Sequence, residues 1–386
     1  MSKKLQIYIG TFSTHFFSGL FNEDTLEIED LHMVEDPGGR SPWLVMDPEE
    51  KFLYAASEWM DGAGGIAAFK RVEGQDPVFL NAIPANTQGP AMITYVEAYG
   101  KKFVMGAGLF EGDVMICPVA EDGSLLPMSH NFNIADVKDW NEAGRPTPTF
   151  PEAKPGESAG VTKPEDWNKV REMSVSNRGQ AHGLKQIPGT NFIIVPDTLN
   201  GELYTFLLTP EGKFELRQVF KDPKFQCPRH MTFSKDGTRL YFLTERTNTM
   251  DAFKINAETG ELTHFFQGNN LPEDFTGNDM SAAIHRSPDG RFVYLSNRGH
   301  NSIVVYNIET DDIKKVGYAD KEIDWPREFL ITPDGDYLLV GNQEIKTVSI
   351  FKIDHETGIP EYTGKTFSLP GEAGAAAFIS RPKTDD

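Results

Sequence analysis

The chain has 386 residues and a formal net charge of −20 at pH 7, from 57 acidic and 37 basic side chains. Nucleic acids and anionic membrane surfaces repel a chain of this charge, so neither is expected as a partner. No apolar run is long enough to span a bilayer. The run Leu5–Ile9 is interrupted by Gly10 and is too short for the core of a signal peptide. Two widely separated cysteines, Cys117 and Cys227, predict reduced thiols in a cytoplasmic protein.

The first predicted elements are one strand and two hairpins. Leu5–Thr11 is a short β-prone run that predicts a single strand. Ser41–Ala56 and Ile93–Ala107 each contain two apolar, β-prone runs, joined by Asp-Pro-Glu-Glu in the first and at Gly100 in the second. Turn residues between two such runs are typical of a tight β-hairpin.

A long segment without strand periodicity follows the second hairpin. The turn glycines Gly100 and Gly189 are separated by about 35–40 residues more than a repeat of about fifty residues requires. The excess falls in Ser129–Asn177, where five prolines and two tryptophans predict an inserted loop, with a short helix at Pro164–Met173. The loop is either a plain surface excursion or a lid over the functional face, because long loops in compact folds often serve as lids.

Four further hairpins and a terminal segment complete the chain. The hairpins are expected at His182–Asp197, Pro228–Leu243, Ala283–Ser296 and Phe329–Val340, and the terminal β-prone segment is Ala375–Ile379. The last three hairpins carry Lys-Asp-Gly or Pro-Asp-Gly at the turn, which is the strongest signal of the series.

The repeated hairpins predict an all-β fold, a seven-bladed β-propeller with four-stranded antiparallel blades. Strands that repeat at about fifty residues, with no amphipathic helix between the turns, are typical of propeller blades. Six hairpins account for six blades. The seventh is expected to take one strand from Leu5–Thr11 and its others from the region of Ala375–Ile379, so that the two chain ends pair and close the ring. Residues 1–386 are expected to form one domain, because closed repeat β folds reach this length.

Three phrases of the chain resemble a known family. They are Cys227-Pro-Arg-His-Met-Thr-Phe, Ser296-Asn-Arg-Gly-His-Asn-Ser-Ile, and Trp325-Pro-Arg-Glu-Phe-Leu-Ile with the later Val340-Gly-Asn-Gln. They resemble the seven-bladed lactonase family, which contains propeller-type 6-phosphogluconolactonases and carboxy-cis,cis-muconate lactonising enzymes. The resemblance extends over nearly the whole chain. It implies an enzyme that acts on a lactone, with a small substrate bearing phosphate or carboxylate and with no cofactor and no metal.

The resemblance also implies a set of catalytic residues. In the muconate-lactonising branch the site holds one histidine, one glutamate and two arginines, which correspond by position to His182, Glu245, Arg229 and Arg298 of this chain. The chain departs from the family around the histidine, where Pro-His-Pro-His is replaced by Gln-Ala-His-Gly. This departure concerns the identity of the substrate more than the class of reaction.

The positions of these four residues along the predicted strands agree with a shared site. His182 and Arg229 open an inner strand, whereas Glu245 and Arg298 close the strand that follows. Because the strands of a hairpin are antiparallel, both kinds of position lie at the same end of a blade. We therefore expect the four groups to meet at one mouth of the central channel. The alternatives are a structural histidine, solvated arginines and a salt bridge between blades.

The charges of the four side chains suggest their roles. Two guanidinium groups suit an anionic substrate and stabilise a developing oxyanion or enolate. His182 can transfer a proton near neutral pH, and Glu245 can orient it or act as its acid–base partner. The same set serves hydrolysis of a sugar-phosphate lactone, which is the first expectation, and cyclisation of carboxy-muconate, which is the second.

Five other residues in the family-like phrases are candidates for substrate binding, with hydrogen bonding between blades as the alternative: Arg327, Asn297, His300, Asn342 and Gln343. His230 and His285 flank inner strands and are expected to be packing residues. Two other classes of function stay open. One is a propeller that binds a protein without catalysis. The other is a calcium-dependent lactonase that uses oxygen ligands from Asp197, Glu245 or Asn297.

Overall fold

The computed structural model describes residues 4–37, 40–60, 63–72, 74–85, 89–109, 112–134, 179–222, 225–370 and 375–382. Across these ranges the regular elements are the strands β1 to β28, with no α-helix among them, so the all-β prediction is confirmed. In the same ranges no helix has the length and apolar character needed to cross a membrane. Among the described residues, neither Cys117 nor Cys227 forms a disulfide bond. The cytoplasmic location stays a prediction.

The chain divides into two compact units. Unit 1 consists of Met1–Glu35, His230–Ile255 and Thr263–Asp386, and unit 2 consists of Asp36–Arg229 and Asn256–Leu262. The single-domain organisation stays a prediction.

Unit 2 contains three groups of four consecutive strands, in which each strand pairs antiparallel with the next. They are β4 (Arg40–Met46), β5 (Phe52–Met60), β6 (Ala63–Lys70) and β7 (Val78–Pro84); β8 (Met92–Ala98), β9 (Lys101–Ala107), β10 (Asp113–Pro118) and β11 (His130–Asn133); and β12 (Lys185–Gln186), β13 (Phe192–Asp197), β14 (Glu202–Leu208) and β15 (Phe214–Lys221).

Unit 1 contains four groups of four strands. In the first group, Pro228, Arg229 and Leu262 belong to unit 2. The four groups are β16 (Pro228–Phe233), β17 (Arg239–Thr244), β18 (Thr249–Ile255) and β19 (Leu262–Asn269); β20 (Met280–Arg286), β21 (Phe292–Arg298), β22 (Ser302–Asn307) and β23 (Lys314–Ala319); β24 (Pro326–Ile331), β25 (Tyr337–Asn342), β26 (Thr347–Ile353) and β27 (Pro360–Ser368); and β28 (Ala375–Pro382) with β1 (Lys4–Thr11), β2 (His15–Asn22) and β3 (Glu27–Glu35).

All six predicted hairpins are present as paired strands, because their turns have the chemistry that the backbone requires. In the Ser-Pro-Asp-Gly turn, Ser287 Oγ donates to Asp289 Oδ1 at 2.5 Å and the N–H of Gly290 donates to Ser287 O at 3.0 Å. Gly290 has φ of 90°, in the left-handed region that glycine enters without a steric penalty. Glu50 occupies the matching place in the first hairpin and still takes φ of 56°.

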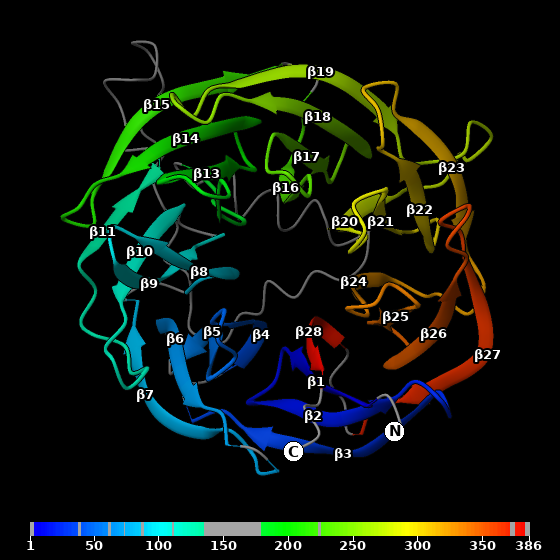
Figure 1. Ribbon diagram of the computed structural model, residues 1–386, viewed down its shortest axis with the longest axis horizontal. Coiled ribbons are helices and arrows are strands. Elements are labelled where there is room, and N and C mark those ends of the chain that lie inside the picture. The colour runs from blue at the N-terminus through cyan, green and yellow to red at the C-terminus, as the bar shows by residue number, and fades with distance from the viewer. Residues whose placement is uncertain are drawn as a thin grey trace. The chain divides into compact units, whose positions relative to one another are not determined.

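The seventh sheet forms from both ends of the chain, but the expected division of strands is wrong. β1 pairs with β28 from Leu5↔Pro382 to Thr11↔Ala375, which confirms the pairing of the termini (Figure 1). The N-terminal end supplies three strands and the C-terminal end only one. The turn between β2 and β3 needs no glycine, because Leu26 itself takes the left-handed φ of 56°. The side chain of Asn22 stabilises the turn by accepting hydrogen bonds from the N–H groups of Asp24 and Thr25. No turn glycine therefore marks this hairpin in the sequence.

The start of the predicted insertion also needs correction. Residues 130–133, placed in the loop from sequence, form β11, which pairs with β10 from Asp113↔Asn133 to Ile116↔His130. Any insertion therefore begins after Ile134. The rest of the predicted loop, its short helix and its role as a lid lie outside the described residues.

Successive sheets of unit 2 are joined by a contact between an aromatic ring and a glycine. A Cβ built on Gly123 would lie 2.1 Å from the ring of Phe52, and the hydroxyl of Tyr54 donates to Gly123 O at 3.1 Å. Phe52 and Tyr54 belong to β5, whereas Gly123 lies in the turn between β10 and β11. A Cβ on Gly260 would similarly lie 2.6 Å from the ring of Phe192.

Unit 1 repeats this contact between its second and third strand groups, β20–β23 and β24–β27. The hydroxyl of Tyr294 on β21 donates to Gly358 O at 2.9 Å, and a Cβ on Gly358 would lie 2.6 Å from the ring of Phe292. Both aromatic side chains are buried. The Phe-x-Tyr phrase in the second strand of a hairpin thus fixes the spacing to the next sheet.

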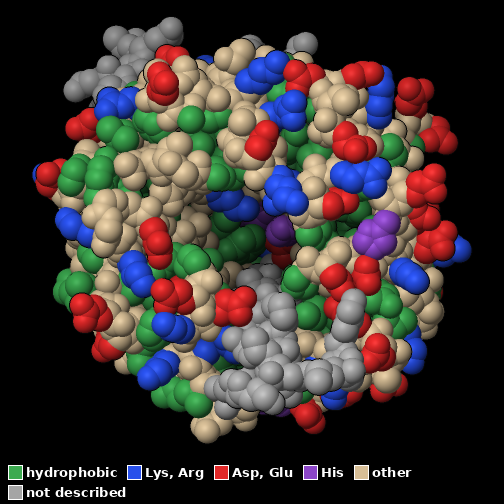
Figure 2. Space-filling view, viewed as in Figure 1, with side chains coloured by type: hydrophobic (Ala, Val, Ile, Leu, Met, Phe, Trp, Pro, Cys, Tyr) green, Lys and Arg blue, Asp and Glu red, His purple; other side chains and the backbone are tan. Residues whose placement is uncertain are grey.

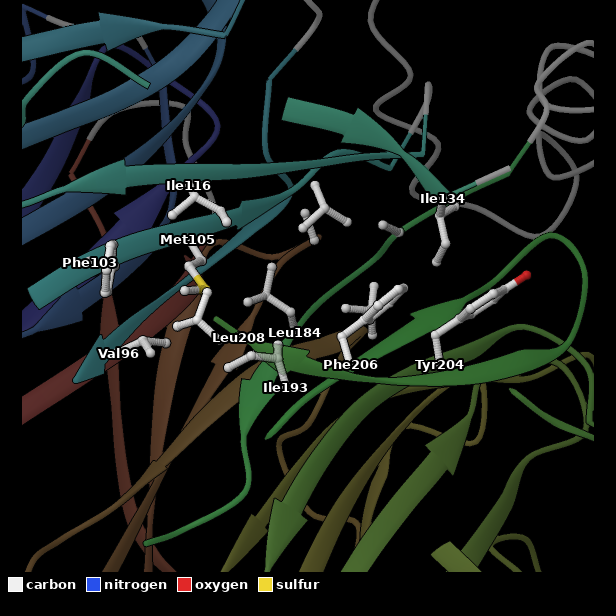
Figure 3. Close-up of a cluster of buried hydrophobic side chains, with 14 of the residues drawn as sticks. Val96, Phe103, Met105, Ile116, Ile134, Leu184, Ile193, Tyr204, Phe206 and Leu208 are labelled. Atoms are coloured by element: carbon white, nitrogen blue, oxygen red, sulfur yellow. The ribbon is translucent and has the colours of Figure 1, made fainter. Parts of the chain in front are cut away.

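The core of unit 2 fills the space between two neighbouring sheets. Figure 3 shows side chains from β8 to β10, such as Phe103 and Met105, facing side chains from β13 and β14, such as Ile193 and Phe206. The Phe206 ring meets that of Phe132 edge-on, with centroids 5.7 Å apart. The outer surface is charged, and Figure 2 shows acidic and basic side chains interspersed over one face.

The contact between Gly358 and Phe292 gives a testable prediction for stability. Alanine at Gly358 meets two penalties: the left-handed φ of 76°, costing about 1–2 kcal/mol, and overpacking against the ring, costing about 1–3 kcal/mol more. Gly364→Ala is the matched control, because its φ is 83° and nothing in the described chain lies within 4 Å of the added Cβ. Urea titrations of both variants should show the larger loss for Gly358→Ala, and equal losses would contradict the interlock.

Candidate active site

The candidate residues of unit 1 lie where the inner strands of successive sheets begin and end. Glu245 directly follows β17, and Arg298 is the last residue of β21. Arg298 Nη2 donates to Glu245 Oε1 in an ion pair, and the side chains are 3% and 6% exposed. Arg298 Nε also donates to Met280 O at 3.2 Å. The guanidinium group is therefore held from two sides, as the salt-bridge alternative anticipated.

The candidate residues of unit 2 lie on two neighbouring segments. His182 precedes β12, beside the bridge between Ala181 and Asp197, and Arg229 is the second residue of β16. A Cβ on Gly183 would lie 3.5 Å from Arg229 O and 2.6 Å from the sulfur of Met92, so the backbone after His182 packs closely against the start of β16. Both side chains are buried, with exposures of 5% for His182 and 2% for Arg229.

Asp197 holds the segment that carries His182. Its Oδ1 accepts N–H bonds from Gln180 at 3.2 Å and from Leu199 and Asn200 at 3.1 Å, and its Oδ2 accepts the amide of Asn200 at 2.6 Å. Burial raises the pKa of Asp197 to about 6, against the opposing effect of these hydrogen bonds. The carboxylate thus serves as a backbone clamp. In the described ranges no group of three or more His, Cys, Asp or Glu residues is arranged to hold a metal ion.

Two of the expected substrate-binding residues are fully engaged within unit 1. Asn297 Oδ1 accepts from Ser281 Oγ at 2.9 Å, and its amide donates to Asn270 O and Ser302 Oγ, both at 3.1 Å. Asn342 Oδ1 accepts the N–H of Asp324 at 3.0 Å, and its amide donates to neighbouring oxygens of the same sheet. Both side chains are buried, and their contacts are the structural hydrogen bonds weighed as the alternative.

The other three lie at the same strand ends of unit 1. The half-buried guanidinium of Arg327 lies over the ring of Phe12, with 4.7 Å from its central carbon to the ring centroid. His300 Nδ1 forms a hydrogen bond with Ser302 Oγ at 2.7 Å, and its burial lowers its pKa. Gln343 follows β25 and is 8% exposed.

The histidines expected to pack have further contacts. His285 Nε2 lies 2.6 Å from Glu328 Oε1, and its ring meets Phe329 edge-on at 4.8 Å. This pair joins β20 to β24. His230 is buried, as expected of a packing residue.

Sequence reasoning overlooked Asp279, which immediately precedes β20. Asp279 Oδ1 accepts the N–H of His300 at 2.8 Å, whereas its buried Oδ2 has no hydrogen-bond partner among the described residues. Burial raises the pKa of Asp279 to about 7, and the charge of Arg298 opposes the shift only in part. No motif marks this residue. The pairing of Met280 with Arg298, which follows from the hairpin, was the one signal that would have placed it beside the arginine.

Trp325 belongs to one of the family-like phrases and lies directly before β24. Its φ is 50°, and its N–H donates to Asn301 Oδ1 at 3.0 Å. The ring centroid lies 5.8 Å from the guanidinium carbon of Arg298. The indole Nε1 is buried and has no hydrogen-bond partner within the described ranges.

Comparison with known proteins adds independent information. A family model described as "Lactonase, 7-bladed beta-propeller" matches residues 6–375. The 6-phosphogluconolactonase of Bacillus subtilis (strain 168) is 26% identical over 370 residues, which cover 94% of this chain and 95% of that protein.

Two solved structures are similar in fold. A protein from Lactobacillus plantarum superposes with a TM-score of 0.79 at 22% identity, over 98% of this chain and 99% of that one. The periplasmic gluconolactonase of Pseudomonas aeruginosa does so with a TM-score of 0.78 at 20% identity, over 99% of each chain. At these identities the similarity shows the fold alone.

The raised pKa of Asp279 predicts a pH dependence of stability. Between pH 3.8 and about 7 the folded protein keeps a proton that the unfolded chain has lost, so the contribution of Asp279 is complete below pH 3.8 and is lost as the pH rises to about 7. Asp279→Asn retains an acceptor for His300 and removes this titration. In urea titrations, the free energy of unfolding of Asp279→Asn minus that of wild type should therefore rise from pH 4 to pH 7 and stay constant above pH 7.

The control for this variant is Asp274→Asn, an exposed aspartate of the same loop. A stability difference between Asp279→Asn and wild type that stays constant from pH 4 to pH 8 would contradict the assignment.

Proposed function

The chain belongs to the seven-bladed β-propeller lactonase family, and from this premise we propose that it hydrolyses a lactone that carries an anionic group, with a sugar-phosphate lactone such as 6-phosphogluconolactone as the substrate. The relative from Bacillus subtilis, which covers nearly the whole chain, bears the name of that activity and supports the choice.

The observation that carries the proposal is the fixed guanidinium group of Arg298. It is buried, paired with Glu245 and bonded to Met280 O, so it does not need to reorganise during a reaction. A preorganised donor of this kind stabilises the oxyanion that develops when water attacks an ester carbonyl. We assign Arg298 this role and Glu245 the role of holding it.

Arg327 is the proposed anchor for the anionic group of the substrate. It is half-buried and stacked on Phe12, so its planar donors are restricted in orientation while part of the group remains accessible. A guanidinium group binds phosphate or carboxylate through paired, charge-assisted hydrogen bonds. Arg229 keeps the role predicted from sequence, as a second group that stabilises negative charge.

His182 is the proposed proton-transfer residue. In lactone hydrolysis the base removes a proton from water as the oxygen attacks the carbonyl carbon. The ring C–O bond then breaks, and the leaving alkoxide oxygen takes the proton from the base and becomes a hydroxyl group. The products are an open-chain hydroxy acid and the regenerated base. An imidazole suits both transfers near neutral pH. Cyclisation of carboxy-muconate stays a prediction that no contact of the described residues favours.

The role of Arg298 predicts that Arg298→Ala lowers kcat/KM for 6-phosphogluconolactone by about 2–4 kcal/mol of transition-state stabilisation. The assay monitors hydrolysis of the lactone through the acid that it releases, and the uncatalysed rate is subtracted. Arg298→Ala also removes one partner of a buried ion pair, which destabilises the fold by about 3–5 kcal/mol.

A double variant separates these two effects. Glu245→Met with Arg298→Met replaces the buried ion pair by apolar groups of similar volume, which is often neutral for stability. We expect the double variant to recover the unfolding midpoint in urea but not the turnover. Wild-type turnover in a well-folded double variant would show that the pair is structural.

The role of His182 gives a separate prediction. His182→Ala should lower kcat by roughly a hundredfold or more, with a smaller change in KM, because a general base acts in the transition state. A general base acts only when it is deprotonated, so His182→Ala should also flatten the acidic side of the profile of kcat against pH. A variant that loses substrate affinity but retains kcat and the pH profile would assign His182 to binding.

A further inference from the structure

Besides Asp279 Oδ2, the part of unit 1 around Arg298 holds two further polar atoms that are buried without a hydrogen bond among the described residues. They are the indole N–H of Trp325, a donor, and Oε1 of Gln343, an acceptor. Both side chains are more than nine-tenths buried, with exposures of 6% and 8%. An unsatisfied buried donor or acceptor costs about 1–3 kcal/mol, so native proteins retain few of them. Two such unsatisfied atoms close together in the fold indicate a binding site for a polar ligand.

The two residues lie side by side at the end of the β24–β27 sheet. The N–H of Gln343 donates to Trp325 O at 3.3 Å, which extends the ladder that pairs Pro326 with Asn342. Trp325 in turn lies beside Arg298. A continuous strip in unit 1 therefore runs from Glu245 through Arg298 and Trp325 to Gln343, hereafter the strip.

The backbone of the strip is held in a conformation that costs energy. Trp325 is a bulky residue with a left-handed φ of 50°, and strain of this kind is often found at ligand sites. Side chains hold it there: Asn301 Oδ1 accepts the N–H of Trp325, and Asn342 Oδ1 accepts the N–H of Asp324, both at 3.0 Å. Asn342 thus positions the strip instead of binding substrate.

The chemistry of the strip matches a hydroxyl group. A hydroxyl both accepts and donates, so a single one can satisfy the indole N–H and the amide oxygen together. A carboxylate only accepts, and it would leave Gln343 Oε1 facing a negative charge unless the amide turns over. Sites that hydrogen-bond a substrate hydroxyl discriminate strongly against analogues that lack it.

We propose that Trp325 and Gln343 form a subsite that binds a ring hydroxyl of the substrate and thereby selects polyhydroxylated lactones over unsaturated dicarboxylates. This inference rests on the proposed hydrolysis of a sugar-phosphate lactone and adds the two residues that select such a substrate. Arg298 polarises the carbonyl, and the adjacent hydroxyl site fixes the rotation of the sugar ring.

The first test is kinetic. Trp325→Phe retains an aromatic ring and removes the N–H, and Gln343→Leu removes the amide. Each should lower kcat/KM for 6-phosphogluconolactone by roughly tenfold or more, as expected for a lost hydrogen bond within a closed site. Among monodeoxy analogues of the lactone, the one that lacks the bound hydroxyl should be hydrolysed equally by wild type and Trp325→Phe. The double variant should lose less than the product of the single losses, because both groups bind one hydroxyl.

Tyr318→Phe is the matched control. Its buried hydroxyl likewise has no hydrogen-bond partner in the described chain, but Tyr318 lies on β23, outside the strip. This variant should retain wild-type kcat/KM. Unfolding midpoints of all variants report on the fold, and a loss of kcat/KM that is equal for every deoxy analogue would overturn the subsite.

A binding measurement separates failure of the subsite from failure of the proposed function. Calorimetry with 6-phosphogluconate, the open-chain hydrolysis product, should show binding that Trp325→Phe weakens about tenfold. Calorimetry with cis,cis-muconate should show no effect of that substitution. Binding of this pattern without lactone hydrolysis would retain the subsite and reject the activity. Hydrolysis with unchanged kinetics in Trp325→Phe, or no binding of 6-phosphogluconate, would reject the subsite.

Discussion

The contact between the Phe-x-Tyr phrase of one sheet and a turn glycine of the next is the constraint on which the sheet arrangement depends. Phe52 and Tyr54 meet Gly123 in unit 2, and Phe292 and Tyr294 meet Gly358 in unit 1. The ring excludes any side chain at the glycine, and the tyrosine hydroxyl satisfies its carbonyl. Neighbouring sheets therefore approach at one fixed distance, and the strand ends that carry polar groups are placed by that distance.

The buried pair of Glu245 and Arg298 illustrates what this rigid spacing makes possible. Each residue comes from a different sheet, and two charges removed from water need good geometry to offset the desolvation cost. The packed sheets provide that geometry. The result is a fixed positive group at the end of β21, flanked by Asp279, whose pKa is raised by burial, and by Trp325. Ionisable groups with shifted pKa values and polar atoms without a hydrogen-bond partner often cluster at functional sites.

Substrate class and reaction type depend on different features of the chain. The family and Arg298 bear on the reaction, because a fixed guanidinium group stabilises an oxyanion whatever the rest of the lactone is. Trp325 and Gln343 bear on the substrate, because a buried donor and a buried acceptor select by hydrogen bonding. A propeller-type site can therefore keep its chemistry while its substrate changes.

The sequence by itself determined the hairpins and the strand positions of Glu245 and Arg298, because turn residues and apolar runs act over a few neighbouring residues. It misplaced the strands of the closing sheet, since Leu26 turns the chain without a glycine. It did not identify Asp279 or the free indole N–H of Trp325. Burial and hydrogen-bond satisfaction belong to groups distant in sequence, such as Arg298 beside Trp325 and Gln343 against Trp325 O. Only the packing of whole sheets decides which polar atoms find a protein partner and which are left for a ligand.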